Sequence, residues 1–283
     1  MSKISFVNGN YLFNHKARIS INDRSLHFSD AVYEVIPVFN YKLIFWKEHY
    51  NRLRKSINHL NINYYDGEKI LKFKCNEIIE KNNMQEGIIY IHISRGIASR
   101  NHDWEKTINP SLIISGLNKR IFVFNEKPIS LISDKDIRWK GTYIKSTSLL
   151  PNVLLKHKAV ENNAGECILK DYKGFITEAT HSNIFLIKER KIITPPLNKN
   201  ILAGITRKKI LDFAKLLKIK IVFKNFKESD IYKADSTFIS NSSSFIVEAN
   251  KLNKKILQSK GKYLIKEIKN KFMEHLGIYD QAK

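Results

Sequence analysis

Two residues, Lys145 and Glu178, suggest chemistry through their types and their spacing. Lys145 ends the run 136–145, and Glu178 lies inside the run 175–185. Apolar and polar residues alternate in both runs, which predicts that each is a half-buried strand. A lysine amine forms a Schiff base with an aldehyde, and a carboxylate can keep a pyridine nitrogen protonated so that the ring accepts electrons. A lysine on one strand, followed by a carboxylate on a second, is therefore what pyridoxal 5′-phosphate chemistry requires.

The pair also has an ordinary interpretation, because the chain holds 49 Lys and Arg residues and most lysines and glutamates are solvent-exposed. The surrounding sequence favours the chemical one. The stretch 136–185 resembles the fold-type IV aminotransferases, and most closely the D-amino acid aminotransferases. The resemblance runs in one register from about Val7 to the last predicted helix. It implies a two-domain enzyme with pyridoxal 5′-phosphate between the domains, Lys145 as the Schiff-base lysine and Glu178 at the pyridine nitrogen.

The hydrophobic pattern predicts an α+β first domain (1–118), a linker (119–126) and a mixed α/β second domain (127–283). An Asn8-Gly9-Asn10 turn predicts a hairpin at the start. Further strands are predicted at 31–38, 42–46, 88–94, 111–116, 166–170, 182–187, 192–194, 237–240 and 245–248. Helices are predicted at 47–60, 67–81, 151–162, 204–217 and 263–276.

The run 202–207 leads directly into an amphipathic helix. The free N–H groups and the dipole of a helix start bind a phosphate dianion, and Gly204 lets the backbone approach closely. A plainly capped helix is the alternative. The resemblance implies that the N–H groups of Ile205 and Thr206 bind the cofactor phosphate and that Leu202 packs on the pyridine ring.

Two further residues match phosphate ligands of the family. Ser242 lies in the donor-rich loop 240–244, and Arg52 lies on the predicted helix 47–60. Composition alone describes the loop as a turn and the arginine as a solvated helix residue. The resemblance instead implies that the Ser242 hydroxyl and the planar Arg52 guanidinium bind the same phosphate.

Tyr33, Arg100 and His102 are the candidate substrate ligands. A cation, an imidazole and a phenol that converge on one point can bind a carboxylate. The alternative is a surface loop with incidental basic residues. The resemblance implies that all three hold the substrate α-carboxylate. It therefore predicts ping-pong transamination of D-alanine with 2-oxoglutarate, which gives pyruvate and D-glutamate.

Two departures from the family pattern concern the substrate range rather than the cofactor. His181 follows Thr180 where the family has small hydroxyl residues, and Pro37 interrupts a predicted strand and so indicates an edge or a bulge. The alternatives on the same fold are a branched-chain L-amino acid aminotransferase and an aminodeoxychorismate lyase. The alternative from another class is a basic polyanion-binding protein without catalysis.

Charge, hydropathy and cysteine content limit the binding partners and the cellular location that we expect. The net charge of +22 comes from lysines spread along the whole chain, which argues against a specific nucleic-acid surface. No apolar run approaches the ~18 residues of a membrane span, and Cys75 and Cys167 form no CxxC pair. We expect a cytoplasmic enzyme without a metal site. The resemblance implies a homodimer in which the loop with Arg100 and His102 enters the neighbouring active site.

Overall fold

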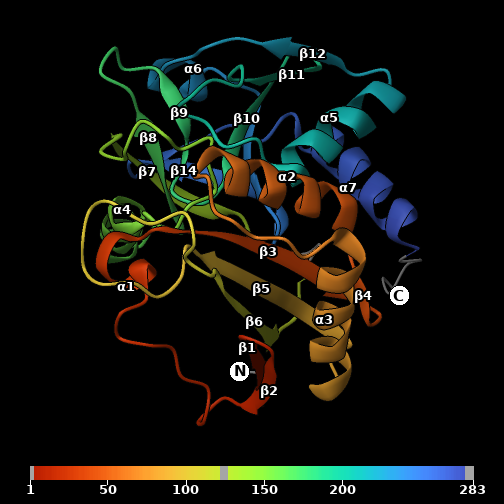
Figure 1. Ribbon diagram of the computed structural model, residues 1–283. Helices are drawn as coiled ribbons and strands as arrows, with labels where there is room; N and C mark the ends of the chain where they lie inside the picture. Colours follow the sequence, from red (N-terminus) through yellow and green to blue (C-terminus); the bar gives the residue numbers. More distant parts are fainter. Residues whose placement is uncertain (1–2, 122–126, 278–283) are drawn as a thin grey trace. The chain divides into compact units, whose positions relative to one another are not determined.

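The computed structural model describes residues 3–121 and 127–277, which form two compact units (Figure 1). Met1–Ile121 and Ile144–Leu149 belong to the first unit, and Phe122–Tyr143 and Leu150–Lys283 belong to the second. Of the predicted linker 119–126, residues 122–126 lie outside the described residues. Lys145 thus belongs to the first unit, although it lies within the range predicted for the second domain.

The first unit contains a six-stranded antiparallel sheet in the order β2-β1-β6-β5-β3-β4. Its strands are β1 (Ile4–Val7), β2 (Asn10–Phe13), β3 (Ala31–Phe39), β4 (Lys42–Leu43), β5 (Glu86–Ser94) and β6 (Ser111–Asn118). Asn8 and Gly9 have φ angles of 45° and 98°, and they form the predicted turn between β1 and β2. Positive φ at both turn residues matches the twist of the two strands, which stabilises the hairpin.

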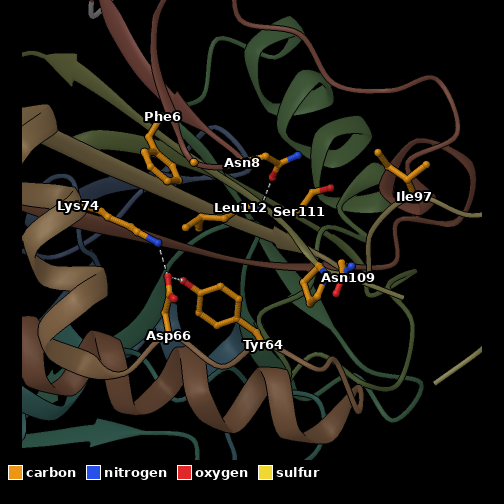
Figure 2. Close-up of a pocket in the computed structure, with 11 residues that line it drawn as sticks. Phe6, Asn8, Tyr64, Asp66, Lys74, Ile97, Asn109, Ser111 and Leu112 are labelled. Atoms are coloured by element: carbon orange, nitrogen blue, oxygen red, sulfur yellow. Dashed lines mark hydrogen bonds and ion pairs between the residues drawn. The ribbon is translucent and has the colours of Figure 1, made fainter. Parts of the chain in front are cut away.

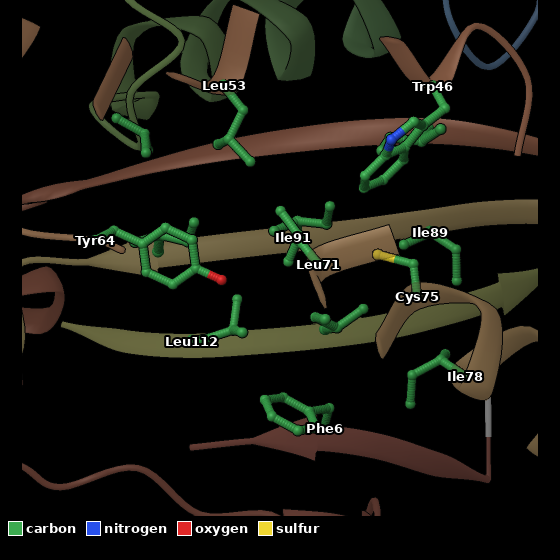
Figure 3. Packing of buried hydrophobic residues seen from close by; sticks show 14 of the residues in the cluster. Phe6, Trp46, Leu53, Tyr64, Leu71, Cys75, Ile78, Ile89, Ile91 and Leu112 are labelled. Atoms are coloured by element: carbon green, nitrogen blue, oxygen red, sulfur yellow. The ribbon is translucent and has the colours of Figure 1, made fainter. Parts of the chain in front are cut away.

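Helices α2 (Trp46–His59) and α3 (Glu68–Lys81) contribute to the same hydrophobic core, which Figure 3 shows. Every second residue of β5, namely Ile89, Ile91 and Ile93, is buried in this core. Because side chains alternate across a strand, Tyr90 and His92 lie on the other face of the sheet. The alternation along β5 therefore places its isoleucines on the packed face of the sheet and its polar aromatic residues on the opposite face.

The predicted strand 136–145 is wrong. Asp136 accepts hydrogen bonds from the backbone N–H of Arg138 (3.2 Å) and from its guanidinium (2.7 and 2.9 Å). Such local side-chain bonds compete with a strand ladder, and the segment turns instead. The chain meets the outer edge of β3 only afterwards, where Ser146 pairs with Val32.

The second unit contains a nine-stranded mixed sheet in the order β12-β11-β10-β13-β14-β7-β8-β9, with β15 paired to β14. Its strands are β7 (Ile129–Lys135), β8 (Glu166–Lys170), β9 (Ile176–Ala179), β10 (Asn183–Lys188), β11 (Lys191–Thr194), β12 (Lys220–Phe223), β13 (Ser236–Asn241), β14 (Phe245–Leu252) and β15 (Lys255–Ile256). Its helices are α4 (Leu150–Glu161), α5 (Ile205–Leu216), α6 (Glu228–Tyr232) and α7 (Lys262–Leu276). Helix α4 packs on β7 and β8, whereas α5 contacts α7, β12 and β13.

Two predictions near β3 concern the strand 42–46 and Pro37. The predicted strand 42–46 is wrong beyond Leu43, because Phe45 adopts a left-handed φ of 54° and α2 begins at Trp46. Pro37 does not interrupt β3. It pairs with Ile88 on one side, and on the other its carbonyl accepts a hydrogen bond from the Ile44 N–H (2.8 Å). The neighbour on that side, β4, is only two residues long, and such an edge tolerates the missing proline N–H.

No helix in the ranges 3–121 and 127–277 is long and apolar enough to cross a bilayer.

Candidate active site

Lys145 is held along the edge of β3. Its carbonyl accepts a hydrogen bond from the Tyr33 N–H (3.0 Å), and its own N–H donates to Ser56 Oγ (3.1 Å). The Lys145 Nζ lies 4.2 Å from the centre of the Tyr33 ring. The first unit therefore brings together the predicted Schiff-base lysine and one predicted carboxylate ligand.

Arg52, a predicted phosphate ligand on α2, binds Glu34 of β3. Its Nε and one terminal nitrogen donate to the two Glu34 oxygens at 2.7 and 2.8 Å. His49 Nδ1 lies 2.7 Å from the same carboxylate. Glu34 and His49 are fully buried and were not singled out from the sequence. His49 and Arg52 are three residues apart on α2 and so lie on the same face of the helix. This spacing is visible in the sequence and could have identified His49.

These contacts shift the protonation of both buried groups. Burial alone would raise the pKa of Glu34, but Arg52 and His49 together hold that pKa well below its ordinary value. Burial lowers the pKa of His49 and outweighs the opposing effect of Glu34; the Arg52 and Lys145 charges lower it further. At neutral pH the three groups are thus a carboxylate, a neutral imidazole and a guanidinium.

Tyr90 and His92 extend the polar face of the sheet beside Tyr33. The Tyr33 and Tyr90 rings lie 5.8 Å apart, and the Tyr90 hydroxyl lies 3.2 Å from His92 Nδ1. Burial raises the pKa of Tyr90 to about 12 and lowers the pKa of His92. The hydroxyl of Tyr90 and the ring of His92 are therefore neutral hydrogen-bonding groups at physiological pH.

Arg100 and His102 lie together, against the ring of Phe28. The Arg100 guanidinium carbon is 5.4 Å from the ring centre, and the His102 ring is 5.3 Å from it. Tyr33 contacts Lys145 and Tyr90 instead. Within the described part of the first unit, Arg100 and His102 therefore both lie against Phe28, whereas Tyr33, the third predicted carboxylate ligand, lies against Lys145.

Glu178 lies on β9 and binds several groups of the second unit. The predicted strand 175–185 is wrong beyond Ala179, because the chain turns at 180–182 and continues as β10 from Asn183. Arg138 forms an ion pair with one of its oxygens. Asn183 Nδ2 donates to the other oxygen at 3.0 Å, and the Leu202 N–H lies 3.2 Å from both. Arg138 and Asn183 are site residues that sequence reasoning missed.

Arg138 lies between two carboxylates, Glu178 and Asp136. Burial raises the pKa of Glu178, and the nearby Arg138 opposes that rise. Burial would lower the pKa of Arg138, but its carboxylate neighbours raise it above its ordinary value. Arg138 therefore stays charged, and Glu178 is a buried acceptor with an elevated proton affinity.

The start of α5 has the features of an anion site. The helix begins after Gly204, and no side chain caps its first N–H groups. A Cβ on Gly204 would lie 2.0 Å from Asn183 Oδ1, so a side chain at this position would displace the Asn183 amide. Ile205 and Thr206, the predicted phosphate ligands, are the first residues of the helix. Free N–H groups at a helix start match the charge of a phosphate.

The serine loop lies next to this helix start. Thr206 Oγ1 donates to the Asn241 carbonyl at 3.0 Å, which ties α5 to the end of β13. The Asn241 side chain accepts hydrogen bonds from the backbone N–H groups of Ser243 and Ser244. Ser242, the predicted phosphate ligand, lies within this ordered turn. The second unit thus contains the predicted ring residues Glu178 and Leu202 and the predicted phosphate ligands Ile205, Thr206 and Ser242.

His181 binds a buried carboxylate. Its Nδ1 lies 2.6 Å from Glu166 Oε2, with the histidine 51% and the glutamate 1% exposed. Thr180 Oγ1 donates to the other Glu166 oxygen. Burial would raise the pKa of Glu166, but His181 and Thr180 hold it below its ordinary value. The unusual histidine therefore lies within hydrogen-bond distance of a buried carboxylate on β8, the strand that pairs with β9.

Two clefts of the first unit lie away from the predicted residues. One, of about 390 Å³, holds Asp66 between Lys74 and Tyr64 (Figure 2). The other, of about 240 Å³, lies beside Arg95 and Trp104. None of the lining residues is a predicted site residue, and the charges of Lys74 and Asp66 already compensate each other.

The sequence matches the model of the family "Amino-transferase class IV" over residues 31–252. A curated relative, the D-alanine aminotransferase of Staphylococcus aureus (strain MSSA476), is 34% identical over 257 residues. These cover 89% of this chain and 90% of the relative.

Solved structures are similar over nearly the whole chain. The branched-chain amino acid aminotransferase of Escherichia coli has a TM-score of 0.92 at 22% identity, and the match covers 100% of this chain and 97% of that one. A putative 4-amino-4-deoxychorismate lyase from Legionella pneumophila has a TM-score of 0.83 at 25% identity, with 93% and 96% covered. The architecture is therefore the two-domain fold of these enzymes.

Proposed function

Because the chain belongs to the amino-transferase class IV family, we propose that it is a D-amino acid aminotransferase that acts on D-alanine and 2-oxoglutarate. The products are pyruvate and D-glutamate. The observation that carries the proposal is the 34% identity to a D-alanine aminotransferase over 89% of the chain. The similarity to branched-chain enzymes at 22% identity supports the fold alone.

Enzymes of this family use pyridoxal 5′-phosphate, which supplies an aldehyde and an electron-accepting ring. The residues present fit this group. The uncapped start of α5, with the close approach at Gly204, suits a phosphate, and buried Glu178 suits a pyridine N–H. In the proposal, the N–H groups of Ile205 and Thr206, the Ser242 hydroxyl and Arg52 bind the phosphate, while Leu202 packs on the ring.

Lys145 is the catalytic base and acid of the proposal. A free lysine has a pKa of ~10.4 and is protonated at neutral pH. With the cofactor bound, the free amine at Lys145 Nζ would take the proton from the substrate α-carbon as a general base and give it back as a general acid. The Tyr33 ring, 4.2 Å away, restricts where that amine can move.

Glu178 would hold a proton at the pyridine nitrogen in its ionised form. Burial raises the pKa of this carboxyl group, whereas the ion pair with Arg138 favours the charged form that such a hydrogen bond needs. Asn183 and the Leu202 N–H fix its orientation. The carboxylate is therefore positioned before any substrate arrives, which is how a preorganised charge accelerates a reaction.

Tyr33, Arg100 and His102 bind the substrate α-carboxylate in the proposal, and Arg100 and His102 act from the neighbouring subunit of a cytoplasmic homodimer. Assays with the D- and L-forms of alanine and leucine test the substrate class. Turnover of D-alanine but not of L-leucine supports the proposal. The reverse preference would assign the chain to the branched-chain L-amino acid enzymes, and release of pyruvate from aminodeoxychorismate would assign it to the lyases.

The cofactor tests the enzyme class itself. The purified protein is expected to be yellow, and borohydride should fix the cofactor to the peptide that contains Lys145, as read by mass spectrometry. Lys145→Ala should fold and retain cofactor through its phosphate contacts, yet turn nothing over. A colourless protein that takes up no added pyridoxal 5′-phosphate would favour the basic polyanion-binding alternative.

A further inference from the structure

We propose that Arg24, the first residue of helix α1 (Arg24–Phe28), is a positioning residue for the segment 100–103, which carries Arg100 and His102. The inference rests on the proposed function, because it assigns to that segment the binding of the substrate carboxylate. Arg24 itself does not touch the substrate in this proposal. It fixes the backbone from which the two ligands project.

The guanidinium of Arg24 binds three consecutive carbonyls of this segment. One terminal nitrogen donates to the carbonyls of Asn101 (2.6 Å) and Asp103 (3.2 Å), and the other donates to that of His102 (3.3 Å). The third nitrogen, Nε, donates to Asp30 at 2.9 Å. A guanidinium holds its donors in a rigid plane, so the three peptide groups are fixed relative to one another.

The charge of Arg24 is compensated away from solvent. Its side chain is 3% exposed and that of Asp30 is 12% exposed. Asp30 also accepts two hydrogen bonds from Arg95, at the base of the same loop. The ion pair with Asp30 fixes the position of the Arg24 guanidinium. Removal of one partner of such a buried pair is costly for stability.

The two proposed substrate ligands and Arg24 share the ring of Phe28. The guanidinium carbon of Arg24 lies 4.7 Å from the ring centre, compared with 5.4 Å for Arg100. The His102 ring lies 5.3 Å away. Helix α1 thus contacts the segment in two ways, through the Arg24 donors to its carbonyls and through Phe28 to its side chains.

The base of the loop is fixed separately, so Arg24 acts chiefly on its tip. The Arg24 N–H donates to the Gly96 carbonyl at 2.9 Å, and the Ala98 N–H donates to that of Asn22 at 3.2 Å. Beyond residue 103 the loop borders the cleft of about 240 Å³. On that side Asn63 Nδ2 donates to the Lys106 carbonyl, and the Arg95 guanidinium carbon lies 4.0 Å from the centre of the Trp104 ring. The Arg24 hydrogen bonds act on the tip itself, at residues 101–103.

The test compares Arg24→Lys with Arg54→Lys. Lysine keeps a charge for Asp30 but cannot bind three carbonyls at once. Arg54 is a matched control, because it donates to a carbonyl of the same unit, that of Tyr64 (2.7 Å), outside the loop. Arg24→Lys should raise KM for both D-alanine and 2-oxoglutarate by about tenfold or more, with kcat at saturation little changed. Arg54→Lys should leave both constants near the wild-type values.

Trypsin cleavage after Arg100 and Lys106 gives a readout that needs no activity. Cleavage should be faster in Arg24→Lys than in Arg54→Lys. Phe28→Leu, which removes the ring but no charge, should show the same KM effect and replaces Arg24→Lys if that variant does not fold.

Unchanged cleavage, a fall in kcat without a rise in KM, or faster cleavage with an unchanged KM would each overturn the inference. A wild-type protein without activity on D-alanine would instead overturn the proposed function. In that case the cleavage comparison would still decide whether Arg24 holds the segment.

Discussion

Arg138 and Glu178 show how single residues of the second unit prepare the proposed chemistry. Arg138 is bound to Asp136, to Glu178 and to the Asn200 carbonyl (3.0 Å), so its own position is fixed. It places a permanent positive charge against the carboxylate that would hold the pyridine proton. In the proposed function, Arg138 would thus act on the ring only through Glu178.

Glu178→Gln should leave a coloured protein whose kcat falls by roughly a hundredfold or more, because an amide cannot keep the ring nitrogen protonated. The absorption spectrum and the steady-state rate measure the two effects. Glu248→Gln is the control, since Glu248 is a partly buried ion-pair partner of Lys269 elsewhere in the unit. Near-normal activity of Glu178→Gln would show that its assigned role is wrong.

The buried His49 predicts a pH effect on stability. Its pKa is lower in the folded protein than in the unfolded chain, where it is ~6.5. As pH falls below that value, the unfolded chain binds a proton that the folded protein does not, so the free energy of unfolding falls, by at most about 1.4 kcal/mol per pH unit.

Urea unfolding at pH 7.0 and 5.5 measures this loss, in a range where Glu34 stays ionised. His49→Asn should make the loss smaller, whereas the exposed His157→Asn should leave it as in the wild type. An equal loss in all three proteins would mean that His49 is not responsible.

Sequence reasoning succeeded for residues whose neighbours along the chain identify them. Glu178 was recognised within the alternating run 175–185, of which Ile176–Ala179 is a strand, whereas the run turns at 180–182 before β10 begins at Asn183. Arg138 was overlooked because its partner Glu178 lies 40 positions away and because the run around it was interpreted as a strand. A hydrogen bond that closes across a fold leaves no periodic trace in the sequence.

Among the elements, the start of α5 constrains the residue at position 204. Gly204→Ala would bring a Cβ against Asn183, which also donates to Glu178 and to the Leu202 carbonyl. The variant should lose pyridoxal 5′-phosphate on dialysis and regain part of its activity when excess cofactor is added.

Gly67→Ala is a matched control, since Gly67 also precedes a helix with an extended backbone and a Cβ there would meet nothing within 4 Å. It should retain cofactor as the wild type does. Equal retention by both alanine variants would refute the special role of Gly204.

The five long helices were predicted within a few residues, whereas several other elements were missed, among them the seven-residue strand β7. The apolar faces of α3, α5 and α7 repeat over three or more turns, which makes the helical period visible. Helices α1 and α6 have five residues each, and β15 has two. Tertiary contacts, rather than a local sequence pattern, determine such segments. Helix α1 is an example, because its Arg24 binds the carbonyls of residues 101–103 in the loop of the proposed substrate ligands.

For the whole molecule, the proposed homodimer predicts complementation. Lys145→Ala and Arg100→Ala should each be inactive or nearly so. Mixed under conditions that allow subunit exchange, they should recover activity, because one site of each heterodimer pairs an intact Lys145 with an intact Arg100. No recovery in heterodimers confirmed by mass spectrometry would mean that the loop serves its own subunit.

The placement of Ile144–Leu149 in the first unit affects the order in which a nascent chain can fold. Domains generally fold as units during synthesis, N-terminal part first. Here β3 receives its neighbour along Ala31–Tyr33 only after more than twenty residues of the second unit have been translated. Until then the newly made sheet exposes a strand edge that can pair with other chains. Translation pauses before residue 144 would thus prolong an aggregation-prone intermediate, and chaperones would have to protect it.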